Sequence, residues 1–153
     1  MPNYVELIPL SAPPVQITCL HASEKGLREG HPSHSGHSAQ NDGGVIVTGS
    51  DDKTVRVWNA ASGNVLKIVG EHGGPVSCVL LQPGRIISAC FDGKVRFIDI
   101  LTGSCIRTVA GHRNAVMSID AKGSIVISGG NDRDLRVSFY SSSSSLVFSS
   151  SER

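Results

Sequence analysis

Hydrophobic and polar positions follow one alternating pattern that returns three times along the chain. The stretch Val45–Asn59 consists of two β-branched runs joined by a polar turn that contains Asp52. Two such runs around a short turn are typical of a β-hairpin. The same pattern returns about 40 and about 80 residues further on, at Arg85–Asp99 and Ile125–Phe139. A fixed period of this size indicates a repeat architecture, in which each unit buries its faces against its neighbours.

The alternation also predicts individual strands. In the middle unit, which is the most regular, strands are expected at Val76–Leu81, Arg85–Ala89, Val95–Asp99 and Cys105–Val109. In the third unit they are expected at Val116–Ala121, Ile125–Ser128 and Leu135–Phe139. The first unit is expected to include Val15–Leu20 and Val65–Val69, and Tyr4–Ile8 aligns with the latter as a strand that closes a blade.

Two segments interrupt the pattern. Residues 21–44 stand where the middle unit has only Gln82–Gly84, and their His, Ser and Gly content predicts an insertion loop. Beyond Tyr140 the composition turns to serine, which predicts a disordered tail over 141–153. We therefore expect repeats over 1–140. Because three units leave two end faces uncovered, we expect a fragment, a truncated isoform or an incomplete gene model, with further blades missing.

The repeated segments also resemble a known family. The run Gly-Ser-Asp-Asp-Lys-Thr-Val-Arg-Val-Trp, which ends at Trp58, is similar to the WD-repeat (WD40) family of β-propellers. The Gly-His pair at Gly111–His112 strengthens the resemblance, and Gly70–His72 is a variant with one additional residue. In that family each repeat contributes a four-stranded blade around a central channel. The resemblance implies an all-β partial β-propeller of about three blades, incomplete as an isolated chain.

The resemblance further implies a structural role for residues that would otherwise suggest a Ser-His-Asp hydrolase. In the family a His, a Ser or Thr, an Asp and a Trp form a hydrogen-bonded network that satisfies buried polar groups. The matching positions are Thr48, Asp52 and Trp58; His72, Ser88 and Asp92; and His112, Ser128 and Asp132. In the first unit Ser50 is an alternative to Thr48. No Gly-x-Ser-x-Gly motif frames these serines, and no other acid, base and nucleophile set converges, so we predict a non-catalytic protein without a cofactor.

Charge and cysteine content narrow the environment and the partners. A formal net charge of +1 argues against a nucleic-acid or membrane partner selected by bulk charge. The four cysteines lack Cys-x-x-Cys spacing, so reduced thiols in a cytoplasmic or nuclear protein are expected rather than a disulfide or zinc framework. His31, His34 and His37 follow one another at three-residue spacing and are weak candidates for a zinc or nickel site. The alternative is a solvated polar loop, because no carboxylate or cysteine completes the set.

An interaction surface is the remaining candidate. In the family, partners dock on the face made by the loop before the first strand of a blade and the turn between its second and third strands. The matching positions are Gln16, Asp51, Ser77, Phe91, Met117 and Asn131. Exposed Phe and Met beside neutral polar groups favour a protein or peptide partner. The alternative for Phe91 is that it covers a neighbouring blade.

The functional prediction is a non-catalytic scaffold or substrate-receptor module. The segment Thr102–His112 resembles propellers of F-box ubiquitin-ligase receptors, which read phosphorylated peptides with arginines at the docking positions. Here those positions carry no Lys or Arg, and Arg113 is the nearest cation, which disfavours the phosphopeptide version. A truncated isoform without independent function, an F-box-type receptor and a metal-binding loop protein remain as alternatives.

Overall fold

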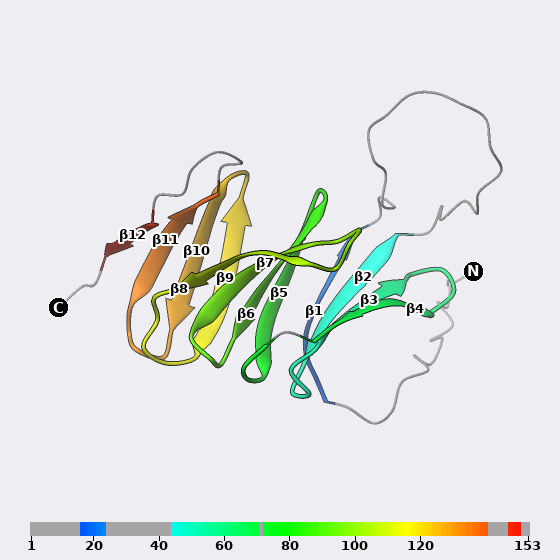
Figure 1. The fold of residues 1–153 in the computed structure, drawn as a ribbon, viewed down its shortest axis with the longest axis horizontal. Helices are drawn as coiled ribbons and strands as arrows, with labels where there is room; N and C mark the ends of the chain where they lie inside the picture. The colour runs from blue at the N-terminus through cyan, green and yellow to red at the C-terminus, as the bar shows by residue number, and fades with distance from the viewer. Residues whose placement is uncertain (1–15, 24–43, 71, 141–146, 151–153) are drawn as a thin grey trace, which may run out of the picture.

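Three antiparallel four-stranded sheets make up the described part of the molecule (Figure 1). The computed structural model describes residues 16–23, 44–70, 72–140 and 147–150. Blade 1 contains β1 (Ile17–Ser23), β2 (Val45–Ser50), β3 (Val55–Asn59) and β4 (Val65–Val69). Blade 2 contains β5 (Val76–Gln82), β6 (Arg85–Cys90), β7 (Lys94–Asp99) and β8 (Cys105–Ala110). Blade 3 contains β9 (Val116–Lys122), β10 (Ile125–Gly130), β11 (Leu135–Phe139) and β12 (Val147–Ser150).

The predicted fold class is confirmed. In every blade the four strands pair in sequence order, so each blade is a meander of hairpins. The strands predicted for blade 2 agree with the structure to within one residue at each end, and β4 and β11 have the predicted bounds. The agreement follows from the alternation itself, because a strand with one buried face has a period of two residues.

Besides β10, which extends two residues beyond its predicted end to Gly130, two predicted boundaries differ from the structure. β1 runs to Ser23, into the expected insertion loop, because His21, Ala22 and Ser23 pair with the first three residues of β2. β12 lies within the segment expected to be disordered, and it pairs with β11 from Leu135 to Ser138. The open edge of β11 offers unpaired backbone groups that this strand satisfies. The strand predicted at Tyr4–Ile8 and the rest of the predicted loop and tail lie outside the described residues, apart from Gly44.

The hydrophobic core lies between the blades. The face of β2 and β3 that points toward blade 2 packs against β5, β6 and β7. The side chains in this layer are Val45, Val47, Val55, Val57, Val76, Val79, Ile86 and Ile98. The other face of blade 2 packs against blade 3 in the same register, through Ile87, Ala89, Val95, Phe97, Val116, Ile119 and Val126. β6 and β7 therefore bury both of their faces. Each fully buried Val or Ile side chain contributes roughly 1.5–3 kcal/mol, so these two layers carry most of the stability.

The inner strands of successive blades approach closely. A Cβ added to Gly49 would lie 2.6 Å from Val76 Cγ1, so the first residue of β5 fills the space above this glycine. Hydroxyl groups join the same strands, because Thr18 Oγ1 donates to the Val76 carbonyl and Ser77 Oγ donates to the Val116 carbonyl. Blades 1 and 2 and blades 2 and 3 thus meet through one repeated contact.

Tyr140, just beyond β11, joins blade 3 to blade 2 a second time. Its ring stacks on Phe97 with 5.1 Å between ring centroids, and the Arg85 guanidinium lies 4.1 Å from the centre of the Tyr140 ring. The Tyr140 backbone N–H donates to the Ser124 carbonyl at 2.7 Å. The aromatic pair and the cation–π contact fix the end of β11 over β6 and β7 of blade 2.

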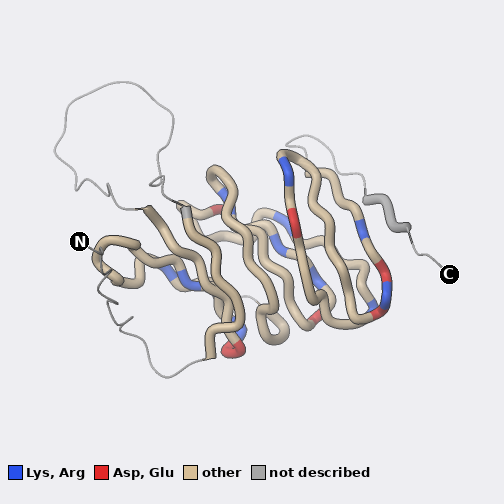
Figure 2. Tube along the Cα trace, turned by 180° about the vertical axis from the view of Figure 1, so that it is seen from behind, with Lys and Arg blue, Asp and Glu red and all other residues tan. Residues whose placement is uncertain are grey.

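Charged residues are distributed over all three blades (Figure 2). No helix among the residues that the structure describes is long and apolar enough to cross a membrane. Because the net charge is small and the charged residues are spread over the blades, charge does not single out one part of the fold. The packing between blades is the feature that organises it.

Replacing Gly93 by Ala is expected to lower the free energy of unfolding by more than replacing Gly84 by Ala. Both glycines have positive φ angles, +78° and +75°, at which an L side chain costs about 1–2 kcal/mol. A Cβ at Gly84 meets nothing within 4 Å, whereas at Gly93 it would lie 2.7 Å from the His112 carbonyl oxygen. Gly84→Ala is therefore the control for backbone strain alone. Urea denaturation that gives equal losses for both variants would contradict the close contact between the blade 2 turn and the loop that enters blade 3.

Candidate functional site

An aspartate anchors the turn between the second and third strands of each blade. Asp52 accepts the backbone N–H of Thr54 at 3.0 Å, and Asp92 accepts that of Lys94 at 3.1 Å. Asp132 accepts the backbone N–H of Asp134 at 3.2 Å. The aspartates of blades 2 and 3 also accept a backbone N–H from the loop that enters their own blade, at 3.1 Å for Gly73 and 2.8 Å for Arg113. The carboxylates therefore tie the turn to the entering loop.

Blade 3 brings its His, Ser and Asp into one chain of hydrogen bonds. His112 Nδ1 lies 3.0 Å from Asp132 Oδ1, and His112 Nε2 lies 2.9 Å from Ser128 Oγ. A carboxylate only accepts, so Nδ1 carries the proton that joins the ring to Asp132. This is the connectivity of a hydrolase triad. However, the side chains of His112 and Asp132 are only 2% and 3% exposed, so the arrangement has no access for a substrate.

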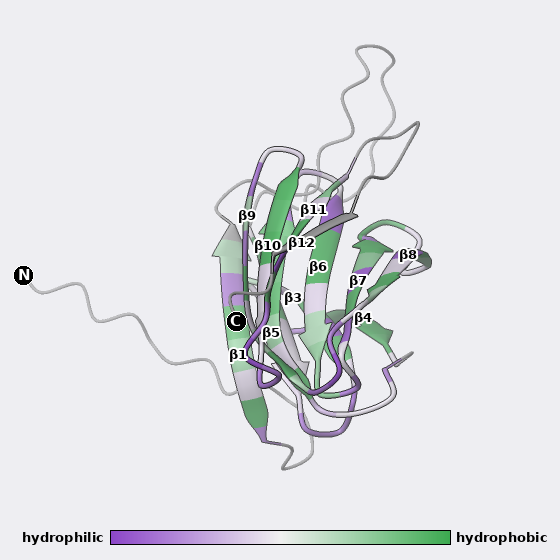
Figure 3. Ribbon diagram, turned by 90° about the vertical axis from the view of Figure 1, so that its left-hand side faces the viewer, coloured by the Kyte–Doolittle hydropathy of each residue, from purple (hydrophilic) through white to green (hydrophobic). Residues whose placement is uncertain are grey.

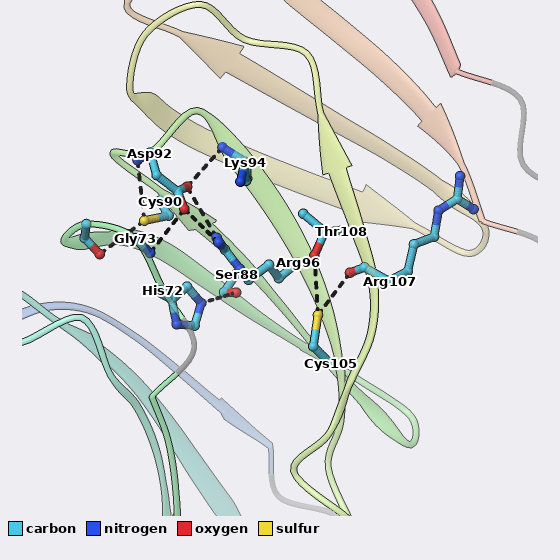
Figure 4. A network of polar contacts seen from close by, with 11 residues as sticks. His72, Gly73, Ser88, Cys90, Asp92, Lys94, Arg96, Cys105, Arg107 and Thr108 are labelled. Atoms are coloured by element: carbon cyan, nitrogen blue, oxygen red, sulfur yellow. Dashed lines mark hydrogen bonds and ion pairs between the residues drawn. The ribbon is translucent and has the colours of Figure 1, made fainter.

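Blade 2 forms only half of this chain (Figure 4). His72 Nε2 lies 2.8 Å from Ser88 Oγ, but Asp92 pairs with Arg96, whose two terminal nitrogens lie 3.2 and 2.6 Å from the carboxylate oxygens. His72 Nδ1 is buried and has no hydrogen-bond partner among the described residues. In blade 2 the arginine therefore pairs with the turn carboxylate, whereas in blade 3 the histidine is hydrogen-bonded to it.

The residue two positions after the turn aspartate explains this difference. In blade 3 that residue is Asp134, which binds the Arg136 guanidinium at 3.1 Å and leaves Asp132 free for His112. In blade 2 the corresponding residue is Lys94, whose ammonium group has no acceptor for a hydrogen bond from Arg96. Where this residue is an acid, it binds the arginine and the turn carboxylate pairs with the histidine. Where it is a lysine, the arginine pairs with the turn carboxylate instead.

Blade 1 divides the network into two parts. Trp58 Nε1 donates to Thr48 Oγ1 at 2.9 Å in the buried interior. Ser50 Oγ donates to the Gln16 carbonyl at 3.0 Å and accepts the backbone N–H of Asp52 at 3.2 Å. Thr48 and Ser50 therefore have different roles. Thr48 accepts the hydrogen bond from Trp58, and Ser50 bonds the turn and the residue before β1. Asp52 pairs with Arg56 at 2.5 Å.

Burial and hydrogen bonding shift the pKa values of these groups. Burial favours the neutral acid, but hydrogen bonds from Thr54 and Arg56 outweigh it and lower the pKa of Asp52 to about 2. Against the same effect of burial, Arg96 holds the pKa of Asp92 well below its usual range, and His112 does the same for the pKa of Asp132. These carboxylates remain ionised at neutral pH.

The imidazole of His72 is shifted in the direction that keeps it neutral. Burial, and then the positive charge of Arg96, lowers the pKa of His72 from its ordinary 6.5 to about 4. The Asp92 carboxylate and the Lys53 backbone oppose this shift only partly. His72 is therefore a neutral hydrogen-bonding group in the folded protein.

The predicted docking positions lie along one rim of the blades. In each blade a turn residue donates its backbone N–H to the carbonyl of the residue immediately before the inner strand. The pairs are Asp51 with Gln16 at 3.2 Å, Phe91 with Pro75 at 2.9 Å and Asn131 with Ala115 at 2.8 Å. In blade 1 this bond joins two predicted positions, Asp51 and Gln16, whereas in blades 2 and 3 the partners are Pro75 and Ala115, which precede the predicted Ser77 and Met117 by two residues. We call this edge the rim, and define it by Gln16, Asp51, Ser77, Phe91, Met117 and Asn131.

The rim residues differ in accessibility. Phe91 and Met117 are 48% and 51% exposed, so Phe91 does not serve mainly to cover the neighbouring blade. Gln16, Asp51 and Asn131 are exposed as well. Ser77 is half-buried, and its hydroxyl is occupied by the Val116 carbonyl, which makes it part of the contact between blades.

Two cations near the rim were not identified from the sequence. Lys53 and Arg133 adopt left-handed backbone conformations, with φ of 69° and 67°, at the position where blade 2 has Gly93. Both are exposed and follow the rim residues Asp51 and Asn131 by two positions. The signal that could have revealed them is the alignment with Gly93, because a glycine in a hairpin turn commonly marks positive φ.

The predicted metal candidates His31, His34 and His37 lie outside the described residues. Within the residues that are described, no three His, Cys, Asp or Glu side chains gather in a way that could hold a metal ion. The four cysteines are all free thiols.

Comparisons with known proteins agree with this architecture. The family model "WD domain, G-beta repeat" matches residues 15–59, 63–99 and 103–137. Nuclear distribution protein PAC1 of Komagataella phaffii is 28% identical over 111 residues, which are 67% of this chain and 22% of that protein. COMPASS component SWD3 of Saccharomyces cerevisiae is 29% identical over 100 residues, which are 63% of this chain and 32% of that protein.

Further similarities cover the same region. Polycomb group protein FIE1 of Oryza sativa is 37% identical over 82 residues, which are 50% of this chain and 22% of that protein. The chain therefore spans at most 32% of the length of these three relatives. The crystal structure of the computationally designed Ika4 protein matches with a TM-score of 0.71 and 24% identity, covering 94% of this chain and 78% of that one. This last likeness shows the fold alone.

Acidification from pH 6.5 to pH 4 is expected to destabilise the protein through His72. In this window the unfolded chain binds a proton at His72, whereas the folded protein, with a His72 pKa of about 4, does not. The free energy of unfolding therefore falls as the pH falls, by at most on the order of 3 kcal/mol. His72→Gln should flatten this slope although it lowers stability at neutral pH. Denaturation series across pH test this, and Asp52 does not interfere because its contribution is lost only below about pH 4. An unchanged slope in His72→Gln would contradict the assignment.

Lys94→Asp is expected to raise the pKa of His72. The new carboxylate matches Asp134 of blade 3 and offers Arg96 a second partner, which frees Asp92 to accept from His72 Nδ1. An NMR titration of the imidazole measures the pKa, and a downfield Nδ1–H resonance reports the new hydrogen bond. Lys94→Asn is the matched control, because it removes the lysine charge without giving Arg96 a carboxylate. Equal pKa shifts in both variants, or no new Nδ1–H resonance, would exclude competition for Arg96 as the cause.

Proposed function

Because the chain belongs to the WD domain, G-beta repeat family, we propose that it is a non-catalytic module that holds a protein or peptide against the rim of its blades. The family is generally non-catalytic, and its members typically bind proteins. The name of the relative SWD3 describes it as a component of a larger assembly, which supports an interaction role. The buried His112 and Ser128 side chains, and the structural hydrogen bonds that they make, support the absence of hydrolase chemistry.

The exposed apolar pair on the rim is the observation that carries this proposal. Phe91 and Met117 are about half exposed on adjoining blades, next to the polar rim residues Asp51 and Asn131. An aromatic ring and a thioether on one rigid surface can each bury apolar area when a partner encloses them, at roughly 1–2 kcal/mol per side chain. The backbone bonds from each turn to the start of the inner strand hold this surface rigid.

The arginines of the repeat do not turn this surface into a phosphate site. Arg56 and Arg96 are 8% and 7% exposed, and their guanidinium groups are held by the turn carboxylates. The exposed cations near the rim include Lys53 in blade 1 and Arg113 and Arg133 in blade 3, and none of these three belongs to blade 2, which carries Phe91. Recognition of a phosphate favours an arginine fork or several converging donors. The proposed partner is therefore an unmodified protein or peptide segment with apolar side chains. We place this function in the cytoplasm or nucleus, and the four free thiols support a reducing compartment.

Phe91→Ala combined with Met117→Ala is expected to weaken peptide binding by roughly tenfold or more, because both apolar anchors are lost. Peptides selected from a random phage-displayed library against the 153-residue chain supply the ligand, and fluorescence polarisation measures its affinity. Added salt should change the affinity only slightly, since few exposed charges take part.

The control for this experiment is Leu66→Ala combined with Ile106→Ala. These side chains are 44% and 49% exposed but lie on the outer strands β4 and β8, away from the rim. Circular dichroism confirms that both double variants keep their strand content. A selected peptide that binds the rim variant unchanged, or that is lost only in the control variant, would refute the rim as the binding surface.

A further inference from the structure

The outer face of blade 3 exposes side chains that the same repeat buries elsewhere. Ile127 and Leu135 are 40% and 49% exposed. Their counterparts one period earlier, Ile87 and Val95, are 0% and 4% exposed, because blade 3 packs on them. Figure 3 views the molecule from the blade 3 end and shows hydrophobic segments along β10. Among the residues that the structure describes, no further blade packs on this face, unlike the equivalent faces of blades 1 and 2.

At the opposite end of the stack, blade 1 also exposes side chains whose counterparts in blade 2 are buried. Ile17 and Leu20, on the inner strand of blade 1, are 43% and 67% exposed. Val76 and Val79 occupy the same register in blade 2 and are 0% and 2% exposed, because they pack on blade 1. The inner strand of blade 1 therefore presents the side chains that normally enter a preceding blade.

A glycine marks where these side chains would fit. In the contact between blades 1 and 2, the Val76 side chain fills the space above Gly49. Gly129 has the same register in blade 3, and a Cβ built there would meet only Ser118 Oγ of its own sheet within 4 Å, at 3.0 Å. Ile17 has the register of Val76 and lies on the other exposed end. Asp120, which pairs with Ile127 across the sheet, is a charged and exposed residue on the blade 3 end, whereas Ile17, Leu20, Gly129 and Ile127 are uncharged.

We propose that a second copy of this chain covers both ends. Blade 1 of one copy packs on blade 3 of the other, with Ile17 above Gly129 and Leu20 against Ile127. This contact repeats the one already present between blades 1 and 2 and between blades 2 and 3. A head-to-tail contact of this kind either closes a ring or extends into a filament.

The number of blades selects two copies. Closed propellers typically have about four to eight blades. Two copies of the three described blades give six, whereas three copies give nine, beyond that range. In a ring of two copies each of the described blades faces another blade, and the two contacts between the chains are equivalent. Phe91 lies on the central blade, away from both ends, whereas Met117 has the register of Ser77, whose hydroxyl bonds to the next blade, and therefore adjoins the contact with the second copy.

The mass of the 153-residue chain in solution tests this proposal first. Size-exclusion chromatography with light scattering at micromolar concentration is expected to give one species of twice 16.1 kDa. Leu20→Glu and Ile127→Lys each place a charge in both contacts of the ring and should weaken dimerisation by at least about 100-fold. Ile106→Lys is the matched control, since this side chain is 49% exposed on the outer strand β8 and lies outside the proposed contact.

Mixing the two charged variants gives the decisive result. A mixed dimer has one contact without substitution and one in which the new Glu faces the new Lys, so an equimolar mixture should return to the mass of a dimer. A misfolded variant could not recover in this way. Recovery also requires a head-to-tail arrangement, because a contact between two like ends would be broken by only one of the substitutions.

Several results would overturn the proposal. A folded wild-type monomer at micromolar concentration would show that the two ends do not recognise each other. A broad distribution of larger species would show open-ended association instead of a closed ring. A dimer that survives both charged variants, or a mixture that stays monomeric, would place the contact elsewhere or remove it.

Discussion

Burial of the first residue of an inner strand against the preceding sheet is the contact on which the rest of the structure depends. Val76 fills the space above Gly49, and Val116 is fully buried on the blade 2 face in the same way. This contact sets the spacing at which Thr18 and Ser77 reach the next strand with their hydroxyl groups. It also brings each turn close to the loop that enters the following blade. The rim is therefore a result of core packing, since its residues lie at the ends of strands that the core has already positioned.

Competition for a turn carboxylate governs the polar part of the structure. Asp52, Asp92 and Asp132 occupy one register and are all ionised, but the side chain that each holds differs. Where no second acid is nearby, the guanidinium forms the stronger charge-assisted bonds with the turn carboxylate, and the histidine bonds only the serine among the side chains of the described residues. Where Asp134 is present, the histidine completes its network. Three copies of one motif thus provide different hydrogen-bond networks from nearly the same residues.

The period of the sequence predicted the strands because alternation and turn residues are local signals. It also identified the residues of the polar network by register. The pairing within that network could not be predicted, since the choice between Arg96 and His72 depends on Lys94 and on geometry between strands. β12 was missed for a related reason, because serine composition favours disorder, whereas the open edge of β11 provides backbone partners that composition does not show. The left-handed turn residues Lys53 and Arg133 were missed because their side chains give no local sign of that conformation.

The repeated contact between blades also bears on how such a chain can change in evolution. The face that blade 1 offers to blade 2 has the same register and the same kinds of side chains as the face that blade 2 offers to blade 3. Duplication or loss of one whole period therefore joins surfaces that already fit and requires no new contact to be invented. A shift by part of a period would place strands out of register and would bury polar positions such as Ser88 against the wrong face. The unit of tolerated change is the complete repeat, so blade number is the property of this fold that gene rearrangement can alter most readily.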